Sequence, residues 1–342
     1  MRRSNGAINK KIGAVQMYLE DVTIEGFKSF SEKTVMGFQP GISVIIGNNG
    51  VGKSNILDAI VWALGESDLD RIRCYTPAEL FFAGSRERPP ADRVAVELTF
   101  KDGKADKAPA IKLRREADRN GTHRFFIADR PYAPPDYSRQ LAAYRLDQAL
   151  KTIIRQEQIN DILLCNPAMR LKTICTWLEL ESTGGFSGSL QESVADSLCR
   201  YMAYLIPEAE VRLELLAQNG TAGVDVVVTL PGNRVRRAHQ LSGGEKAVTS
   251  LALKLAIFDQ LQNPFYLLDE VEPSLDYTHH KSMQAFLKDV ATQTQLIMIT
   301  HLRSTIELAD TLHGVRTRWD GSSFMKFYFD MDERLLRLYK CC

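Results

Sequence analysis

Three features are scarce in this sequence, and each scarcity excludes a class of protein. Six residues are cysteine, without the paired spacing that holds a structural zinc ion, which is typical of reduced thiols. The formal net charge is only +1, so any contact with nucleic acid has to come from local basic clusters. No apolar run approaches the ~20 residues of a membrane span, so we expect a cytoplasmic protein without a membrane partner.

The sequence instead alternates short apolar strands with amphipathic helices. A charged meander of antiparallel strands is expected at 94–127, and mainly helical structure at 138–182. Further strands are expected at 18–25, 42–46, 211–215, 224–230, 265–268 and 296–300, and helices after 54, at 190–205, after 241 and at 278–290. Such alternation predicts an α/β fold, with helices packed on a parallel sheet.

A run of small residues at 182–189 indicates the clearest boundary between two lobes. We therefore expect an N-terminal lobe at 17–181, a short linker at 182–197 and a C-terminal lobe at 198–342. Residues 1–16 are expected to form a loose extension, because periodic sequence begins only at Met17.

The most specific motif is the phosphate-binding loop at 47–54, which fits G-x-x-x-x-G-K-[ST]. A buried strand precedes it and an amphipathic helix follows, which is the context that the motif requires. Its glycines let backbone N–H groups point at phosphate oxygens, Lys53 supplies a cation, and Ser54 offers a hydroxyl to Mg²⁺. The expected nucleotide contacts are Gly47, Asn48, Asn49, Gly50, Val51, Gly52, Lys53, Ser54 and Asn55.

A second motif is the apolar strand at 265–268, which ends in two carboxylates. Ligands in open parallel sheets bind at the carboxyl ends of strands. We expect Asp269 to hold Mg²⁺, and Glu270 to orient and deprotonate an attacking water. A strand ending in Asp-Glu is commonplace alone, but beside a phosphate loop it indicates nucleotide hydrolysis.

The third motif is Leu241-Ser-Gly-Gly-Glu-Lys246. Ser242 and Glu245 have the spacing of a capping box that opens a helix. Gly243 and Gly244 leave the amino end of that helix free of side chains, so an anion can approach it closely. The glycines alone do not say which anion binds.

These motifs, with Ser274-Leu-Asp276 and Thr300-His301 in this order, resemble the set of the ATP-binding-cassette (ABC) superfamily. In that superfamily the LSGG motif contacts the γ-phosphate held by the opposite subunit. The resemblance therefore implies a dimer, with a second copy or a related head, that encloses two ATP molecules and Mg²⁺. Residues 242–245 would contact the nucleotide of the partner.

The finer resemblance is to the head of the structural-maintenance-of-chromosomes (SMC) family, bacterial type. It covers about residues 17–180 and 198–335, and is carried most clearly by 19–30, 53–66, 82–85 and 241–315. It implies an ABC-type P-loop NTPase head of two lobes, with a mixed central sheet flanked by helices and an antiparallel β-meander. It also implies an ATPase of chromosome condensation or segregation, associated with the nucleoid.

The resemblance implies further site residues. Gln156 would lie near Mg²⁺ and the attacking water, with Gln158 as an alternative. Arg73 would reach the nucleotide, with Arg71 as its competitor. By the same resemblance His301 senses the γ-phosphate. Asp276 couples the two sites across the dimer.

One departure from the family is the missing arm. SMC proteins separate the two head lobes by a long coiled coil with a hinge, whereas only 182–197 joins them here. The sequence leaves open whether the short connection is natural. A kleisin subunit is an expected partner through the C-terminal lobe, although the base of the arm, which supplies half of that interface, is missing.

Non-specific DNA contact is a further expectation, and it would target phosphates. It rests on two basic clusters: Lys101, Lys104, Lys107, Lys112, Arg114, Arg115, Arg119 and Arg124 in the meander, and Arg234, Arg236 and Arg237 before the LSGG motif.

Three other functions compete with this interpretation. A RecF-like repair ATPase shares the head and lacks a long arm, but the amino-acid sequences at 242–246 and 300–310 argue against it. The energising subunit of a membrane transporter would not carry the meander. A non-hydrolysing DNA-binding or kleisin-docking module would not need Lys53, Asp269 and Glu270 together.

Overall fold

The computed structural model describes residues 17–102, 110–218, 221–261, 263–272, 277–331 and 335–338. The expected extension at 1–16 lies outside these residues.

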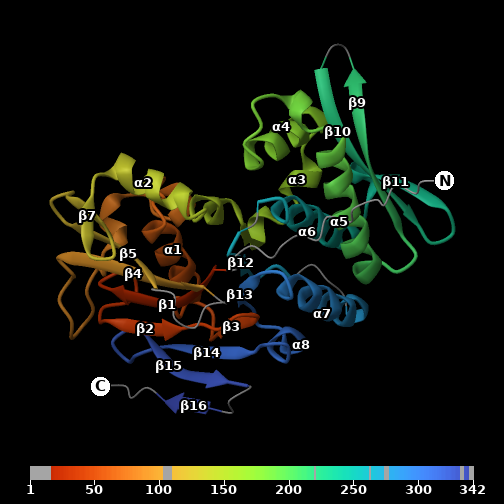
Figure 1. Cartoon of the computed structure of the whole chain (residues 1–342). Coiled ribbons are helices and arrows are strands. Elements are labelled where there is room, and N and C mark those ends of the chain that lie inside the picture. Colours follow the sequence, from red (N-terminus) through yellow and green to blue (C-terminus); the bar gives the residue numbers. More distant parts are fainter. Residues whose placement is uncertain are drawn as a thin grey trace, which may run out of the picture.

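A mixed seven-stranded sheet forms the centre of the molecule (Figure 1). Its order is β16-β15-β14-β3-β13-β12-β8, in which β14, β3, β13, β12 and β8 run parallel, and β15 pairs antiparallel with both β14 and β16. The strands are β3 (Ile42–Ile46), β8 (Ile153–Arg155), β12 (Phe265–Asp269), β13 (Gln295–Ile299), β14 (Thr311–Thr317), β15 (Ser323–Asp330) and β16 (Leu335–Leu338).

The expected meander is confirmed as a six-stranded antiparallel sheet of order β2-β1-β4-β5-β6-β7. Its strands are β1 (Met17–Glu25), β2 (Thr34–Gly37), β4 (Arg93–Asp102), β5 (Ile111–Asp118), β6 (His123–Ile127) and β7 (Arg130–Tyr132). Helix α1 (Lys53–Ala63) contacts β1, β4 and β5. Its apolar side chains share one core with the meander and one face of the central sheet.

The opposite face of the central sheet belongs to a second core, with most of the remaining helices. A three-stranded antiparallel sheet of order β11-β10-β9 lies at the outer end of this part (Figure 1). Its strands are β9 (Glu210–Gln218), β10 (Thr221–Leu230) and β11 (Arg234–Arg237), and the helices are α3 (Asp161–Leu164), α4 (Pro167–Trp177), α5 (Ser189–Leu205), α6 (Gly243–Phe258), α7 (Tyr277–Ala291) and α8 (Arg303–Ile306).

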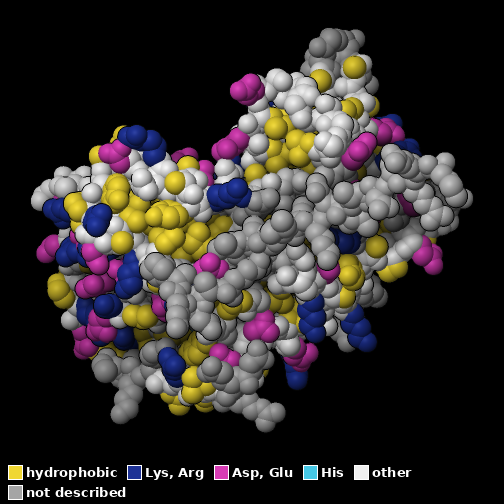
Figure 2. Space-filling model, in the orientation of Figure 1, with side chains coloured by type: hydrophobic (Ala, Val, Ile, Leu, Met, Phe, Trp, Pro, Cys, Tyr) yellow, Lys and Arg dark blue, Asp and Glu magenta, His cyan; other side chains and the backbone are white. Residues whose placement is uncertain are grey.

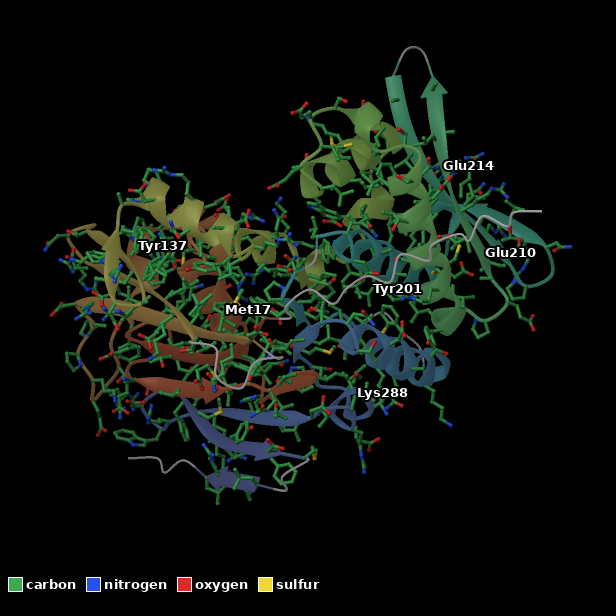
Figure 3. All side chains as sticks on the ribbon, in the orientation of Figure 1. Met17, Tyr137, Tyr201, Glu210, Glu214 and Lys288 are labelled. Atoms are coloured by element: carbon green, nitrogen blue, oxygen red, sulfur yellow. The ribbon has the colours of Figure 1, made fainter. Side chains whose placement is uncertain are left out.

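A buried tyrosine lies in each of the two cores: Tyr137 in the core with the meander, and Tyr201 in the core with most of the remaining helices (Figure 3). Tyr137, on α2 (Pro134–Ala143), donates a hydrogen bond to the Ala63 carbonyl at 2.7 Å, which ties α2 to the end of α1. Tyr201, on α5, donates to the Asp259 carboxylate and stacks edge-on against Phe286 of α7. The two separate cores agree with a division into two lobes, which remains a prediction.

The helix expected at 190–205 is confirmed as α5, which begins at Ser189 and packs against α6 and β9. It includes the second half of the stretch 182–197, whose role as a linker stays a prediction. The stretch 138–182 is mainly helical, as expected, but it also contains the strand β8, which pairs with β12. Its three residues are too few for a periodic signal. The 3₁₀ helices are Asp70–Ile72, Pro77–Leu80, Asp147–Lys151, Gln156–Gln158, Thr183–Gly185 and Ala238–Gln240. In the described part of the chain, every helix is too short or too polar to cross a bilayer.

Candidate nucleotide-binding site

Four parallel strands end side by side, and a residue predicted for the site follows or ends each of them. In sheet order these strands are β3, β13, β12 and β8. β3 leads into Gly47, β13 leads to His301, β12 ends at Asp269 and β8 leads into Gln156. Because parallel strands present their carboxyl ends at one edge of a sheet, the four segments converge there.

The loop after β3 has the curled backbone that its glycines predict. Gly50 and Gly52 have φ angles of 78° and 95°, in the left-handed region where a side chain is strained. Gly52 caps the amino end of α1, so the positive end of that helix faces the loop. This arrangement suits a bound phosphate.

Lys53 bridges the loop that precedes it. Its Nζ donates to the carbonyl oxygens of Gly47 at 2.9 Å and Asn48 at 3.0 Å. Burial lowers the pKa of Lys53, while the carboxylates of Glu270 and Asp269 oppose that shift. The ammonium group is therefore held inside the loop, close to the acidic end of β12.

Ser54 and Asp269, the two residues expected to hold Mg²⁺, contact each other. The Ser54 hydroxyl donates to Asp269 Oδ1 at 3.3 Å. Burial raises the pKa of Asp269, although Ser54 and the neighbouring Arg73 and Arg155 lower it, so the ionised carboxylate would gain from a bound cation. A hydroxyl and a carboxylate fit Mg²⁺, which takes few protein ligands and completes its shell with phosphate and water. The described residues hold no cluster of three or more His, Cys, Asp or Glu that would bind a metal without a nucleotide.

Glu270 and His301 contact each other at the carboxyl edge. His301 Nε2 lies 2.9 Å from Glu270 Oε1, and both side chains are partly exposed. Glu270 has a φ of 49°, which a residue with a side chain adopts rarely, and its N–H donates to the Ile299 carbonyl at 2.9 Å. Strained backbone of this kind is common at functional sites, because surrounding structure has to maintain it.

The strand register favours Gln156 over Gln158 as the glutamine at this edge. Arg155, the last residue of β8, pairs with Asp269 of β12, so Gln156 follows that pair directly, as the first residue of the 3₁₀ turn Gln156–Gln158. Gln158 instead lines a separate small cavity, and its carbonyl accepts a hydrogen bond from Lys254 of α6. The role of Gln156 toward a nucleotide stays a prediction.

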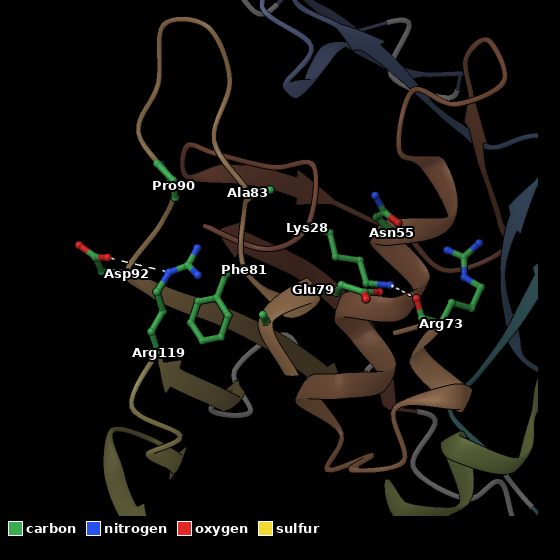
Figure 4. A pocket seen from close by; sticks show the side chains of 10 residues that line it. Lys28, Asn55, Arg73, Glu79, Phe81, Ala83, Pro90, Asp92 and Arg119 are labelled. Carbon is green, nitrogen blue, oxygen red and sulfur yellow. Dashed lines mark hydrogen bonds and ion pairs between the residues drawn. The ribbon is translucent and has the colours of Figure 1, made fainter. Parts of the chain in front are cut away.

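The structure also separates Arg71 from Arg73. Arg73 forms an ion pair with the Asp58 carboxylate of α1. It also lines a cavity of about 810 Å³ beside the start of that helix (Figure 4). Arg71 pairs with Glu66 at 2.8 Å and is 55% exposed. Arg73 is therefore the arginine on the side of the phosphate loop.

Sequence reasoning missed the buried charge cluster behind the loop. Asp58 is fully buried and its oxygens contact Lys28 at 2.7 Å, Arg73 at 2.7 Å and Arg155 at 2.8 Å. One carboxylate thus joins α1, the turn at 26–30, the 3₁₀ turn at 70–72 and the end of β8. The available signal was an acidic residue on α1 between the apolar pairs 56–57 and 60–61.

The LSGG motif stands apart from these residues. The capping box is confirmed: the Ser242 N–H donates to the Glu245 carboxylate at 2.7 Å, and the Ser242 hydroxyl accepts from the Glu245 N–H at 3.4 Å. Ser242 and Gly243 are exposed, while Gly244 is half-buried. In Figure 1, α6 lies among α3, α5 and α7, away from α1. The free end of α6 is thus open to another molecule. The expected coupling residue Asp276 lies outside the described residues.

Most basic side chains of the meander cluster pair with acidic side chains, and one of them, Arg115, is not on the surface as expected. Arg115 is buried, and its guanidinium donates to the carbonyls of Trp62 and Glu66 at 2.7 and 2.6 Å. Arg115 lies on the buried face of β5, opposite to Arg114, so it cannot contact DNA. The other described members pair with acids: Lys101 with Glu20, Lys112 with Glu97, Arg114 with Glu116, Arg119 with Asp92 and Arg124 with Asp118. Lys104 and Lys107 lie outside the described residues.

The surface shows the same mixture of charges. Basic and acidic side chains are interspersed over the meander side in Figure 2. In the second cluster, Arg237 pairs with Asp225 at 2.7 Å and with Glu214 at 3.1 Å, whereas Arg234 and Arg236 are exposed on β11. The described part of β11 is therefore the better candidate for a phosphate contact.

Sequence comparison finds a matching family and relatives that are chromosome partition proteins. Residues 18–323 match the family described as "RecF/RecN/SMC N terminal domain". A stretch of 119 residues is 41% identical to the chromosome partition protein Smc of Mycolicibacterium paratuberculosis, which is 34% of this chain and 10% of that protein. The Smc of Lactiplantibacillus plantarum is 32% identical over 162 residues, which is 46% of this chain and 14% of the relative. The chain thus matches only a small part of the length of these relatives.

Two solved SMC heads have a similar architecture. An Smc head bound to the C-terminal winged-helix domain of ScpA has a TM-score of 0.84 at 28% identity, covering 93% of this chain and 100% of that one. The SMC head domain from Thermotoga maritima has a TM-score of 0.68 at 31% identity, covering 90% and 98%. The family match over most of the chain and the shared architecture show that this chain belongs to the RecF/RecN/SMC family and has the ABC-type fold of an SMC ATPase head.

Proposed function

We propose that this chain is an SMC-type head that binds ATP with Mg²⁺ and hydrolyses it between two engaged heads. The observation that supports this proposal most is the convergence of the phosphate loop, Asp269, Glu270 and His301 at the carboxyl ends of the parallel strands of the central sheet. The triphosphate would lie on the loop at 47–54. The nucleoside would extend past Asn55 toward the cavity that Lys28 and Arg73 line.

The residues of this edge divide the work of hydrolysis. Lys53 and the backbone N–H groups of the loop would hold the outer phosphates. Ser54, Asp269 and Gln156 would hold Mg²⁺, which supplies charge neutralisation to the phosphates when bound. Glu270 would accept a proton from the attacking water, and its contact with His301 would fix the orientation of its carboxylate.

Two heads are needed to complete each site in this proposal. The amino end of α6 is exposed at Ser242 and Gly243, and it suits the γ-phosphate held by a second head. ATP would then join two heads, and hydrolysis would release them. Asp276 would couple the two sites.

The cellular role that we propose is chromosome organisation or segregation. It rests on the relatives, which are chromosome partition proteins, and it places the protein at the nucleoid. Two of the similar head structures are bound to domains of ScpA, so a protein of that kind is the proposed further partner. Non-specific DNA contact is proposed through Arg234 and Arg236, which are exposed.

Turnover by matched variants tests the catalytic assignment. Glu270→Gln should retain ATP binding and lose about 10²-fold or more in the rate of phosphate release, because the general base is removed. Lys53→Ala should instead lose nucleotide binding. Full-speed hydrolysis by Glu270→Gln would refute the role of Glu270, and tight ATP binding by Lys53→Ala would refute the placement of the phosphates.

A further inference from the structure

The carboxyl-terminal strands form a wall against the phosphate loop. Strand β14 is the neighbour of β3 on the side opposite β13, and β15 follows β14 in the sheet. A Cβ added to Gly47 would lie 2.5 Å from the Val315 carbonyl of β14. A Cβ added to Gly52 would lie closer than 3.0 Å to the hydroxyls of both Ser29 and Ser323. The loop therefore rests directly on residues about 270 positions away in sequence.

Ser323, the first residue of β15, makes the closest polar contacts with this loop. Its Oγ lies 2.7 Å from the Val51 carbonyl oxygen and 2.7 Å from Ser29 Oγ. Its N–H donates to the Ser29 carbonyl at 2.7 Å. Asn55 of α1 donates from Nδ2 to Ser29 Oγ at 2.8 Å. Ser323 is almost fully buried, so water does not compete for these contacts.

The Val51 carbonyl can only accept, so the Ser323 hydroxyl is the donor of the bond between them. Ser29 Oγ lies 2.7 Å from Ser323 Oγ and accepts a hydrogen bond from the Asn55 amide. The Ser323 hydroxyl is therefore held between Ser29 and the Val51 carbonyl.

The hydrogen bond from Ser323 fixes the orientation of one peptide unit of the phosphate loop. In a planar trans peptide the C=O and the following N–H point in opposite directions. A Val51 carbonyl held on the Ser323 side therefore turns the Gly52 N–H away from that wall, to the side where the loop would receive phosphate. Gly52, with a φ of 95°, has no side chain to fix this peptide by itself.

We propose that Ser323 is a positioning residue for nucleotide binding, which acts by holding the Val51 carbonyl and so presenting the Gly52 N–H to the phosphates. This inference rests on the proposed binding of nucleotide at residues 47–54. It makes phosphate binding by the amino-terminal loop depend on the strand that begins at Ser323. The ligand class concerned is a nucleoside di- or triphosphate, because loops of this type cradle the inner phosphates with N–H groups.

Ser323→Ala in the whole chain tests the proposal, with Ser322→Ala as its matched control. Ser322 is also fully buried, but its hydroxyl donates to Asp320 and not to the loop. Titration calorimetry with ADP and with ATP should show about a 3- to 10-fold loss of affinity for both nucleotides in Ser323→Ala, the size of one hydrogen bond. KM for ATP should rise by a similar factor while kcat at saturating ATP stays unchanged. Ser322→Ala should bind as the wild type does.

Wild-type affinity in Ser323→Ala, or an equal loss in Ser322→Ala, would overturn the inference while leaving the proposed function intact. Failure of the wild type to bind either nucleotide would remove the proposed function itself. If Ser323→Ala unfolds at a lower temperature without nucleotide, Ser323→Cys decides the question. It keeps the side-chain volume but donates weakly, so it should restore the fold and still bind ADP more weakly than the wild type.

Discussion

Replacement of Glu272 by glutamine should stabilise the protein at alkaline pH and have little effect at acid pH. Glu272 is 2% exposed, and within the described residues its Oε1 has no hydrogen-bond partner. Burial raises its pKa from 4.5 to about 7, although hydroxyls of Thr305 and Thr300 oppose the shift. The folded state therefore binds a proton that the unfolded state releases between these two values.

The sign and size of the effect follow from proton linkage. Between pH 4.5 and 7 the unfolded state binds fewer protons than the folded state, so the contribution of Glu272 to stability falls as pH rises. At ~1.4 kcal/mol per pH unit, the loss is under about 1 kcal/mol at pH 5 and about 3 kcal/mol at pH 8. A glutamine side chain at this position resembles the protonated acid and carries no such penalty.

Chemical unfolding at pH 5 and pH 8 measures the difference between the two proteins. The contributions of the other titrating groups cancel in the difference in unfolding free energy between the variant and the wild type. The change of that difference with pH therefore reports on Glu272 alone. Glu272→Gln should gain about 2 kcal/mol more, relative to the wild type, at pH 8 than at pH 5. The same difference at both pH values would show that Glu272 is ionised in the folded protein and would refute the reasoning.

Three further predictions concern side chains whose contacts are described above. Asp58→Asn leaves Lys28, Arg73 and Arg155 without their shared carboxylate and should cost on the order of 3 kcal/mol of unfolding free energy in urea. The exposed pair Arg303–Glu307 is the control, and Glu307→Gln should cost under about 1 kcal/mol; equal costs would contradict the cluster. His301→Ala should lower kcat roughly 10-fold or more with little change in ADP affinity by calorimetry, because it frees the Glu270 carboxylate; an unchanged kcat would contradict that contact. Arg115→Met should cost about 2 kcal/mol of unfolding free energy without changing the affinity for DNA, because the guanidinium is buried on the Trp62 and Glu66 carbonyls. Arg236→Ala should weaken DNA binding at low salt in a mobility-shift assay, because Arg236 is exposed. Loss of DNA binding in Arg115→Met but not in Arg236→Ala would contradict these assignments.

The parts of the site that could be predicted are those whose chemistry requires consecutive residues. The strand expected at 42–46 has the same bounds as β3, and the loop that follows it has the expected left-handed glycines. The capping box at Ser242 is formed as its spacing predicts. In these cases the signal and the structure lie within a few residues of each other, so local rules suffice.

The parts that could not be predicted depend on pairs of residues that only the tertiary fold brings together. Nothing near Ser323 in sequence indicates that its hydroxyl contacts the loop at Val51. Asp58 carries a local signal, an acid on an apolar helix face, but its partners come from three separate segments. Arg114 and Arg115 are adjacent in a basic run, yet they lie on opposite faces of β5 because strand side chains alternate.

The sedimentation mass of the Glu270→Gln protein, measured with and without ATP and Mg²⁺, tests most directly whether ATP joins two heads. Slow hydrolysis should preserve the ATP-bound state, so a dimer should form only with ATP. Ser242→Arg in the same background should abolish that dimer, because it blocks the free end of α6. A monomer under all conditions, or a dimer that is indifferent to ATP and to Ser242→Arg, would contradict the proposal that two heads share their nucleotides.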